Sequence, residues 1–78
     1  MKTLTPRQEQ ILRYIYIFTK IKGFSPKYND IGAKFNMSAT GTVPQHLAAL
    51  EKKGYIRKVT GRGVLLTPQA KVFINQSK

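Results

Sequence analysis

The sequence predicts a small, mainly α-helical fold that includes one β-hairpin, and three observations support this fold class. Apolar residues recur at three- and four-residue steps, as on one face of a helix. A Thr-Pro or Ser-Pro pair, which is typical of a helix start, precedes three of the expected helices. A β-branched and aromatic stretch is followed by a glycine-bearing turn and an apolar return. With 78 residues, of which 41% are hydrophobic, we expect residues 1–78 to form one domain with one modest core.

The first helix is expected over residues 6–22. Thr5 is its predicted N-cap, Pro6 occupies the first helical position, and Gln8 follows the cap at the spacing of a capping box. The helix should end at Gly23, since a Lys in the last turn and a Gly just beyond it are typical of a C-terminus. Its apolar face, at three- and four-residue steps, is expected to comprise Ile11, Leu12, Ile15, Phe18 and Ile21.

A second helix is predicted over residues 26–35, with Ser25-Pro26 as its cap and first residue and with Ile31 and Phe35 on its buried side. A turn of small and polar residues follows, and a third helix is expected over residues 41–53. Its Pro44 requires a start within a residue or two of Gly41, because only in the first turn does the missing N–H cost no hydrogen bond. The core face of this third helix, at i, i+4 and i+7, is Val43, Leu47 and Leu50.

The C-terminal third is predicted to form a β-hairpin, or wing, over residues 55–66 and a short helix over residues 68–75 that starts at Thr67-Pro68. Two roles are open for this last helix. It folds back onto the first helix and completes the core, which is the preferred interpretation, or it forms a dimer contact. The residues on its apolar side are Ala70, Phe73 and Ile74.

The charge balance points to a polyanionic partner. Fourteen Lys and Arg against 3 Asp and Glu give a net charge of +11 and a pI near 10.4. So many like charges repel one another within the folded domain, and this excess is expected where a protein binds nucleic acid. The basic residues are scattered along the chain rather than gathered in one block, so folding must bring them together.

Other classes of protein are disfavoured. The chain has no Cys, no apolar stretch near the ~20 residues that span a bilayer, and no apolar signal region at its start, so we expect a cytoplasmic, nucleoid-associated protein without membrane contact. His46 is the single histidine, and Glu9, Asp30 and Glu51 are far apart in the sequence. No catalytic constellation, metal-ligand spacing or phosphate loop is present, so no enzyme activity, cofactor, metal or small-molecule ligand is expected.

Helix, helix, short turn, helix and hairpin is the order of a winged helix-turn-helix: a three-helix core, a two-stranded wing and here a short C-terminal helix. In such folds the helix after the turn enters the major groove of duplex DNA. Thr42 and Gln45 can reach base edges there, while Gly41 and Ala48 allow a close approach. Steps of 100° from the core face place on the opposite side Gly41, Gln45, Ala48 and Lys52, flanked by Thr42 and Ala49.

Phosphate contacts are expected from helix N-termini and from basic side chains around that surface. Lys20, Lys22 and Lys71 lie outside the expected contact area. The predicted phosphate-contacting residues are Arg7, Lys27, Tyr28, Lys52, Lys53, Arg57, Lys58 and Arg62.

Several motifs together resemble the N-terminal domain of LexA repressors: Leu4-Thr5-x-Arg7-Gln8, Ile11-Leu12, Lys22-Gly23-Phe24-x-Pro26, Asp30-Ile31-Gly32 and Val43-x-x-His46-Leu47-x-x-Leu50-Glu51-x-Lys53-Gly54-Tyr55-Ile56-Arg57. The resemblance runs without gaps over about residues 1–57 and more loosely to Leu66. It implies a repressor that binds an operator as a dimer. The base contacts that it implies are at the positions of Ala39, Gly41, Thr42 and Gln45.

LexA proteins continue into a self-cleaving domain that also dimerises them, and no counterpart is present here, so self-cleavage is not expected. A stand-alone domain of this kind suggests a phage or mobile-element regulator, or a part excised from a longer protein. The unusual Gly41 and Pro44 at the start of the third helix mean that the operator sequence of the family is not carried over.

The leading hypothesis is therefore a sequence-specific regulator of transcription, most simply a repressor, that binds double-stranded DNA as a homodimer on paired half-sites. The alternative is a winged-helix module that binds a protein of the transcription or replication machinery. Against it, the outer face of the third helix is small and polar and lacks apolar anchors. Binding of single-stranded DNA or RNA would need exposed aromatic residues. Most aromatic residues of this chain are instead expected in the core.

Overall fold

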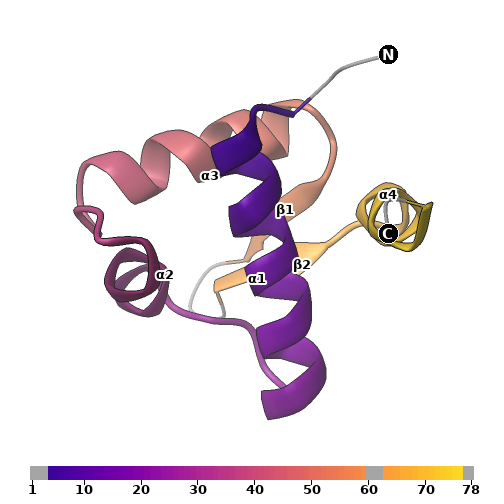
Figure 1. The fold of residues 1–78 in the computed structure, drawn as a ribbon, viewed down its shortest axis with the longest axis horizontal. Coiled ribbons are helices and arrows are strands. Elements are labelled where there is room, and N and C mark those ends of the chain that lie inside the picture. The colour runs from indigo at the N-terminus through magenta and orange to yellow at the C-terminus, as the bar shows by residue number, and fades with distance from the viewer. Residues whose placement is uncertain (1–3, 60–62, 77–78) are drawn as a thin grey trace.

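The computed structural model describes residues 4–59 and 63–76. The order of its elements is that of a winged helix-turn-helix, and the predicted fold class is confirmed (Figure 1). The two strands pair antiparallel, with Ile56 opposite Leu66 and Val59 opposite Gly63. The elements are α1 (Pro6–Lys22), α2 (Tyr28–Phe35), α3 (Thr42–Lys52), β1 (Ile56–Val59), β2 (Gly63–Leu66) and α4 (Pro68–Gln76).

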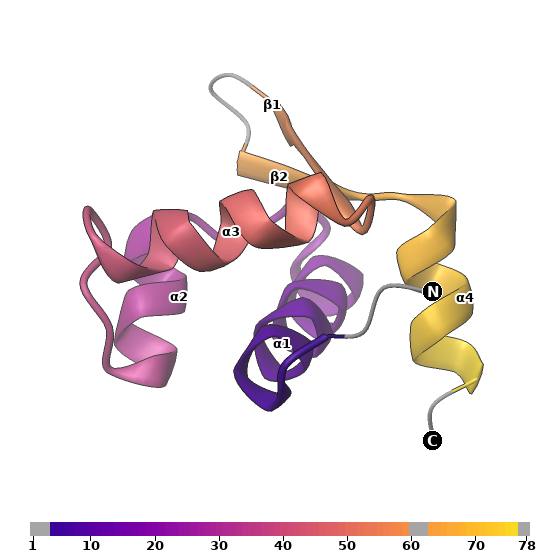
Figure 2. The same cartoon turned by 90° about the horizontal axis from the view of Figure 1, so that it is seen from above.

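Helix α1 runs through the middle of the molecule, with α2 on one side of it and α4 on the other, as two perpendicular views agree (Figures 1 and 2). Its predicted N-terminus is confirmed: Thr5 Oγ1 accepts from Gln8 N at 3.2 Å, and Gln8 Oε1 accepts from Thr5 N at 3.2 Å. Gly23 ends the helix in the left-handed region. The prediction that Ile21 is buried was wrong. It is 74% exposed, because the last turn of α1 extends beyond the elements that pack on it.

Helix α2 begins at Tyr28, so the predicted start at Pro26 was wrong by two residues. The Asp30 carboxylate accepts from Lys27 N at 2.9 Å, which makes Lys27 the N-cap. The Ser25 hydroxyl, expected to cap the helix, instead accepts from Val64 N of β2 at 3.2 Å. A tertiary contact therefore uses the side chain that the local pattern assigned to the helix.

Helix α3 is one residue shorter at each end than the predicted 41–53, because Gly41 and Lys53 are its caps. Ser38 prepares its start: Ser38 Oγ accepts from Gly41 N at 3.1 Å, and Ser38 O accepts from Val43 N at 2.9 Å. Pro44 is the third helical residue, where its missing N–H needs no partner, as predicted.

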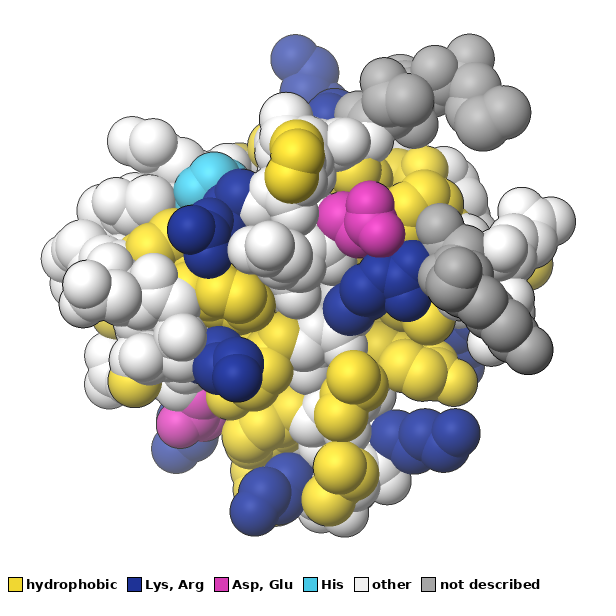
Figure 3. All heavy atoms as spheres, in the orientation of Figure 1, with side chains coloured by type: hydrophobic (Ala, Val, Ile, Leu, Met, Phe, Trp, Pro, Cys, Tyr) yellow, Lys and Arg dark blue, Asp and Glu magenta, His cyan; other side chains and the backbone are white. Residues whose placement is uncertain are grey.

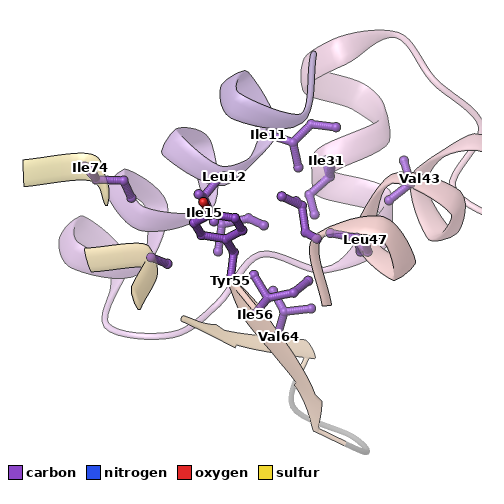
Figure 4. Close-up of a cluster of buried hydrophobic side chains, with 12 residues drawn as sticks. Ile11, Leu12, Ile15, Ile31, Val43, Leu47, Tyr55, Ile56, Val64 and Ile74 are labelled. Atoms are coloured by element: carbon purple, nitrogen blue, oxygen red, sulfur yellow. The ribbon is translucent and has the colours of Figure 1, made fainter. Parts of the chain in front are cut away.

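The core lies where α1, α2, α3, the hairpin and α4 meet (Figure 4). Helix α4 belongs to this core. Ala70 and Ile74 are buried, and the Phe73 ring lies 5.5 Å from the Tyr55 ring, edge to face. The preferred interpretation, that the last helix folds back onto α1, is confirmed. The buried apolar side chains are Ile11, Leu12, Ile15, Ile31, Val43, Leu47, Leu50, Tyr55, Ile56, Val64, Ala70 and Ile74.

Candidate nucleic-acid interface

Helix α3 has two faces of opposite character. Val43, Leu47 and Leu50 are fully buried, so the predicted core face is confirmed. The opposite residues are all exposed, as the 100° steps predicted, and among them only Lys52 is charged. Ala39, in the turn before the helix, is half-buried, as are His46 and Ala49 on its sides. We call the exposed set the recognition face: Gly41, Thr42, Gln45, Ala48 and Lys52.

Arg7 lies beside the end of α2, close to the turn that leads into α3. Its guanidinium carbon is 5.5 Å from the centroid of the Phe35 ring, and this cation–π contact restricts an otherwise exposed cation. Phe35 in turn meets the Tyr14 ring edge to face at 5.6 Å. Burial, and secondarily the charge of Asp30, raises the pKa of the Tyr14 phenol above its usual value.

The N-terminus of α2 carries two of the predicted phosphate contacts. Lys27 is exposed at the N-cap, and Tyr28, the first helical residue, is half-buried against the core. The Asp30 carboxylate already binds Lys27 N, which places a negative charge at this helix end. The Lys27 side chain is therefore the part of this terminus that is available to a phosphate.

The wing carries Arg57 on its exposed face, opposite the exposed Leu65. Lys58 is tied to α3: its Nζ lies 3.9 Å from Glu51 Oε1, and its backbone N donates to Glu51 Oε2 at 3.5 Å. This pair joins the wing to the C-terminal end of the helix. Arg62 lies outside the described residues.

Lys52 and Lys53, adjacent in sequence, have different surroundings. Lys52 is exposed on the recognition face. Lys53 is half-buried, and its Nζ donates to Gln8 Oε1 at 2.8 Å, which joins the end of α3 to the start of α1. Helical periodicity predicts that the two side chains point in different directions. It does not predict that Lys53 binds Gln8, which is 45 residues away in the sequence.

A contact between the wing and the loop before α2 was not predicted. Ser25 Oγ accepts from Val64 N at 3.2 Å, and Gly63 packs against the same hydroxyl so closely that an added Cβ would overlap with it. That Cβ would also lie 3.2 Å from the Pro26 carbonyl oxygen. The return strand of the wing is thereby attached to the helix-turn-helix. No local pattern indicates this contact, because its partners are 39 residues apart.

The acidic residues neutralise little of the positive charge. Glu9 pairs with Arg13 at 3.0 Å within α1, while Asp30 and Glu51 make the contacts already described. On the face shown in Figure 3, Lys and Arg side chains stand apart from one another rather than in one block. Among residues 4–59 and 63–76, no helix is long and apolar enough to cross a membrane, and no group of three His, Asp or Glu could share a metal ion.

Comparison with known proteins gives a consistent result. The family model of the LexA DNA binding domain matches residues 1–63. The chain is 44% identical over 68 residues to a LexA repressor of Geobacter metallireducens, which covers 85% of this chain and 34% of that protein. It is 48% identical over 58 residues to a LexA repressor of Shouchella clausii (74% and 28%) and 49% identical over 57 residues to one of Leptospira biflexa (73% and 28%). The chain thus spans about a third of the length of the curated relatives it matches. The chain belongs to the LexA DNA-binding domain family.

Proposed function

We propose that this domain binds double-stranded DNA sequence-specifically and represses transcription, with α3 in the major groove and the wing against the flanking backbone. The observation that carries the proposal is the recognition face, which is exposed, small and polar along the helix that follows the turn. Small residues at Gly41 and Ala48 let a helix backbone approach base edges. This face has no bulky apolar side chain that would prevent its entry into the groove.

Base reading is assigned to the side chains of this face and of the turn before it. Gln45 can form a bidentate pair with adenine, and the Thr42 methyl group can contact a thymine methyl. Gly41 and Ala48 set the depth of entry, and Ala39 contributes from the turn. Each good bidentate pair discriminates against a wrong base by about 1–3 kcal/mol, so Gln45 is the residue expected to contribute most to specificity.

Phosphate contacts are assigned to the cations around the face. Arg7, Lys27, Lys52 and Arg57 are exposed, which favours this role. Lys53 and Lys58 already bind Gln8 and Glu51, so a phosphate would have to share or replace those partners. Tyr28 and Arg62 stay in the proposal as predicted from the sequence.

The regulatory role rests on the relatives, which are named LexA repressors. A bound domain that covers a promoter excludes other proteins from the same DNA. One recognition helix offers few base contacts, so we propose binding as a homodimer on two half-sites about one helical turn apart.

The test of DNA binding is its dependence on salt. Labelled duplexes selected from a random pool should bind with a log affinity that falls linearly with log salt, by about 0.9 per phosphate contacted. If about six phosphates are contacted, the affinity should fall about a thousandfold between about 50 and 200 mM salt. A flat salt dependence, or equal affinity for the matching single strands, would contradict the proposal.

The recognition face is tested with Gln45→Ala and Arg57→Ala. The first should remove about 1–3 kcal/mol of discrimination between the selected and a mismatched duplex. The second should weaken all duplexes alike and reduce the salt slope by about 1, because it removes a phosphate contact. Both are read in parallel titrations of the two duplexes. If Gln45→Ala leaves discrimination unchanged, base reading is assigned to the wrong face.

A further inference from the structure

A hollow of about 320 Å³ lies between the C-terminal half of α1, the end of β2 and the first half of α4. Because α2 and α4 lie on opposite sides of α1, the hollow is separated from the helix-turn-helix by α1 itself (Figure 2). None of the predicted DNA-contacting residues lines it. The lining residues are Tyr16, Thr19, Lys20, Leu66 and Lys71.

The lining of this hollow is more apolar than polar. Tyr16 and Leu66 form part of its lining. On the same half of α1, Ile17 and Ile21 are 52% and 74% exposed, and Phe24 just beyond the helix is 59% exposed. Figure 3 shows hydrophobic side chains along this end of α1. Exposed apolar groups that line a hollow are typical of a site where another molecule binds.

The rim is positively charged. Lys20 and Lys71 line the hollow, one from α1 and one from α4. The Lys20 Nζ lies 5.7 Å from the centroid of the Tyr16 ring, a cation–π contact that restrains this cation at the rim. None of the three acidic side chains of the chain lines the hollow. Glu9 and Asp30 lie in the first turns of α1 and α2, and Glu51 lies near the C-terminal end of α3.

The apolar lining and the positive rim of the hollow decide which kind of molecule can bind there. A second copy of the chain would bring another positive charge of +11 and only three acidic side chains, so two such rims repel each other. Duplex DNA matches the lysines but presents phosphates rather than apolar groups to fill an apolar hollow. A volume of about 320 Å³ lies at the lower end of the range for binding pockets, which is room for a few side-chain groups.

We propose that this groove binds a short acidic, amphipathic segment of another protein. One or two large apolar side chains of that segment enter the hollow beside Tyr16 and Leu66, and its Asp or Glu carboxylates pair with Lys20 and Lys71. The site is on the opposite side of α1 from α2, so the domain can hold such a partner while α3 faces DNA. The proposal does not depend on the proposed function.

The probe is a labelled helical peptide of about 16 residues, with Leu and Phe along one face and Glu on both flanks. Lys71→Glu should weaken its binding about tenfold, because it replaces an attraction with a repulsion beside the hollow. Lys34→Glu is the matched control: Lys34 is exposed on α2, across α1 from the groove, and the change in net charge is the same. It should weaken binding less than about twofold, since only distant charge changes.

Several results would overturn the proposal. One is an equal loss with Lys71→Glu and Lys34→Glu, or equal binding of a peptide in which Ser replaces Leu and Phe, because either means attraction by net charge alone. Another is a larger loss of duplex affinity with Lys71→Glu than with Lys34→Glu, which would assign the groove to DNA. The last is binding to phosphatidylglycerol vesicles that Lys71→Glu abolishes, together with no peptide binding. In the expected outcome, amide NMR shifts move at Thr19, Leu66 and Lys71, and duplex affinity responds equally to both variants.

Discussion

Leu47→Ala is expected to lower the free energy of unfolding by about 2–5 kcal/mol, because it leaves a cavity in the middle of the core face of α3. Leu47 is fully buried in the cluster that joins α1, α3 and the hairpin. A chain of this length has a total stability of about 4–12 kcal/mol, so the loss is a large share of it. Urea denaturation followed by circular dichroism gives the value, and the midpoint of thermal unfolding should fall by about 10–30 °C.

Gln45→Ala is the control for this prediction, since Gln45 lies on the same helix but on the exposed recognition face. It should change stability by less than about 0.5 kcal/mol while it reduces DNA discrimination. The two variants thus separate folding from recognition on one helix. Similar losses of stability in both would mean that α3 is rotated about its axis and that the proposed interface is buried.

Gly63→Ala is expected to lower the free energy of unfolding by about 2–5 kcal/mol, from two sources that add. Gly63 has φ +85°, in the left-handed region where a Cβ costs about 1–2 kcal/mol. The new Cβ would also overlap with the Ser25 hydroxyl and approach the Pro26 carbonyl oxygen, and such overpacking costs about 1–3 kcal/mol. The strain acts where β2 attaches to the helix-turn-helix. We therefore expect the wing to shift and duplex affinity to fall along with stability.

Gly23→Ala isolates the first source, the cost of the left-handed backbone, because Gly23 has the same φ of +85° and an added Cβ there would meet nothing within 4 Å. It should cost only the conformational part, about 1–2 kcal/mol. The double variant Ser25→Gly with Gly63→Ala should cost less than the sum of the two single changes, as groups in contact do. A Gly63→Ala variant no less stable than Gly23→Ala would show that the contact with Ser25 does not restrict this position.

The starts of α1 and α3 were predictable, because each depends on residues that are neighbours in the sequence. The Thr5 and Gln8 capping box, and Pro44 in the first turn of α3, act over a few residues, so their patterns indicate their structure directly. The start of α2 was not predictable in this way. Ser25-Pro26 has the pattern of a helix start, but the Ser25 hydroxyl accepts from Val64 N of β2. The helix begins at Tyr28, two residues after Pro26, where the Asp30 carboxylate accepts from Lys27 N. The exposure of Ile21 has a similar cause, since periodicity defines a face but not where the neighbouring elements stop.

The candidate interface was likewise predictable in part from the sequence. The recognition face follows from the 3.6-residue period, because three buried residues on one helix determine which residues are opposite. The partners of the surrounding basic side chains do not follow from this period. Lys53 binds Gln8 across 45 residues, Lys58 binds Glu51 of the preceding helix, and Arg7 lies over the ring of Phe35. The net charge of +11 does not indicate which of the basic side chains already have a partner within the domain.

The amino-acid sequence by itself determined the order of the elements, the caps of α1 and α4 and the buried side of α3, because these depend on interactions within one helix turn or one period. Only the tertiary structure decided three other features: that α4 completes the core, that Ser25 attaches the wing, and that α1, β2 and α4 enclose a basic-rimmed groove. Each of these brings together residues far apart in the chain. Their meeting depends on how whole elements pack, which no local pattern encodes.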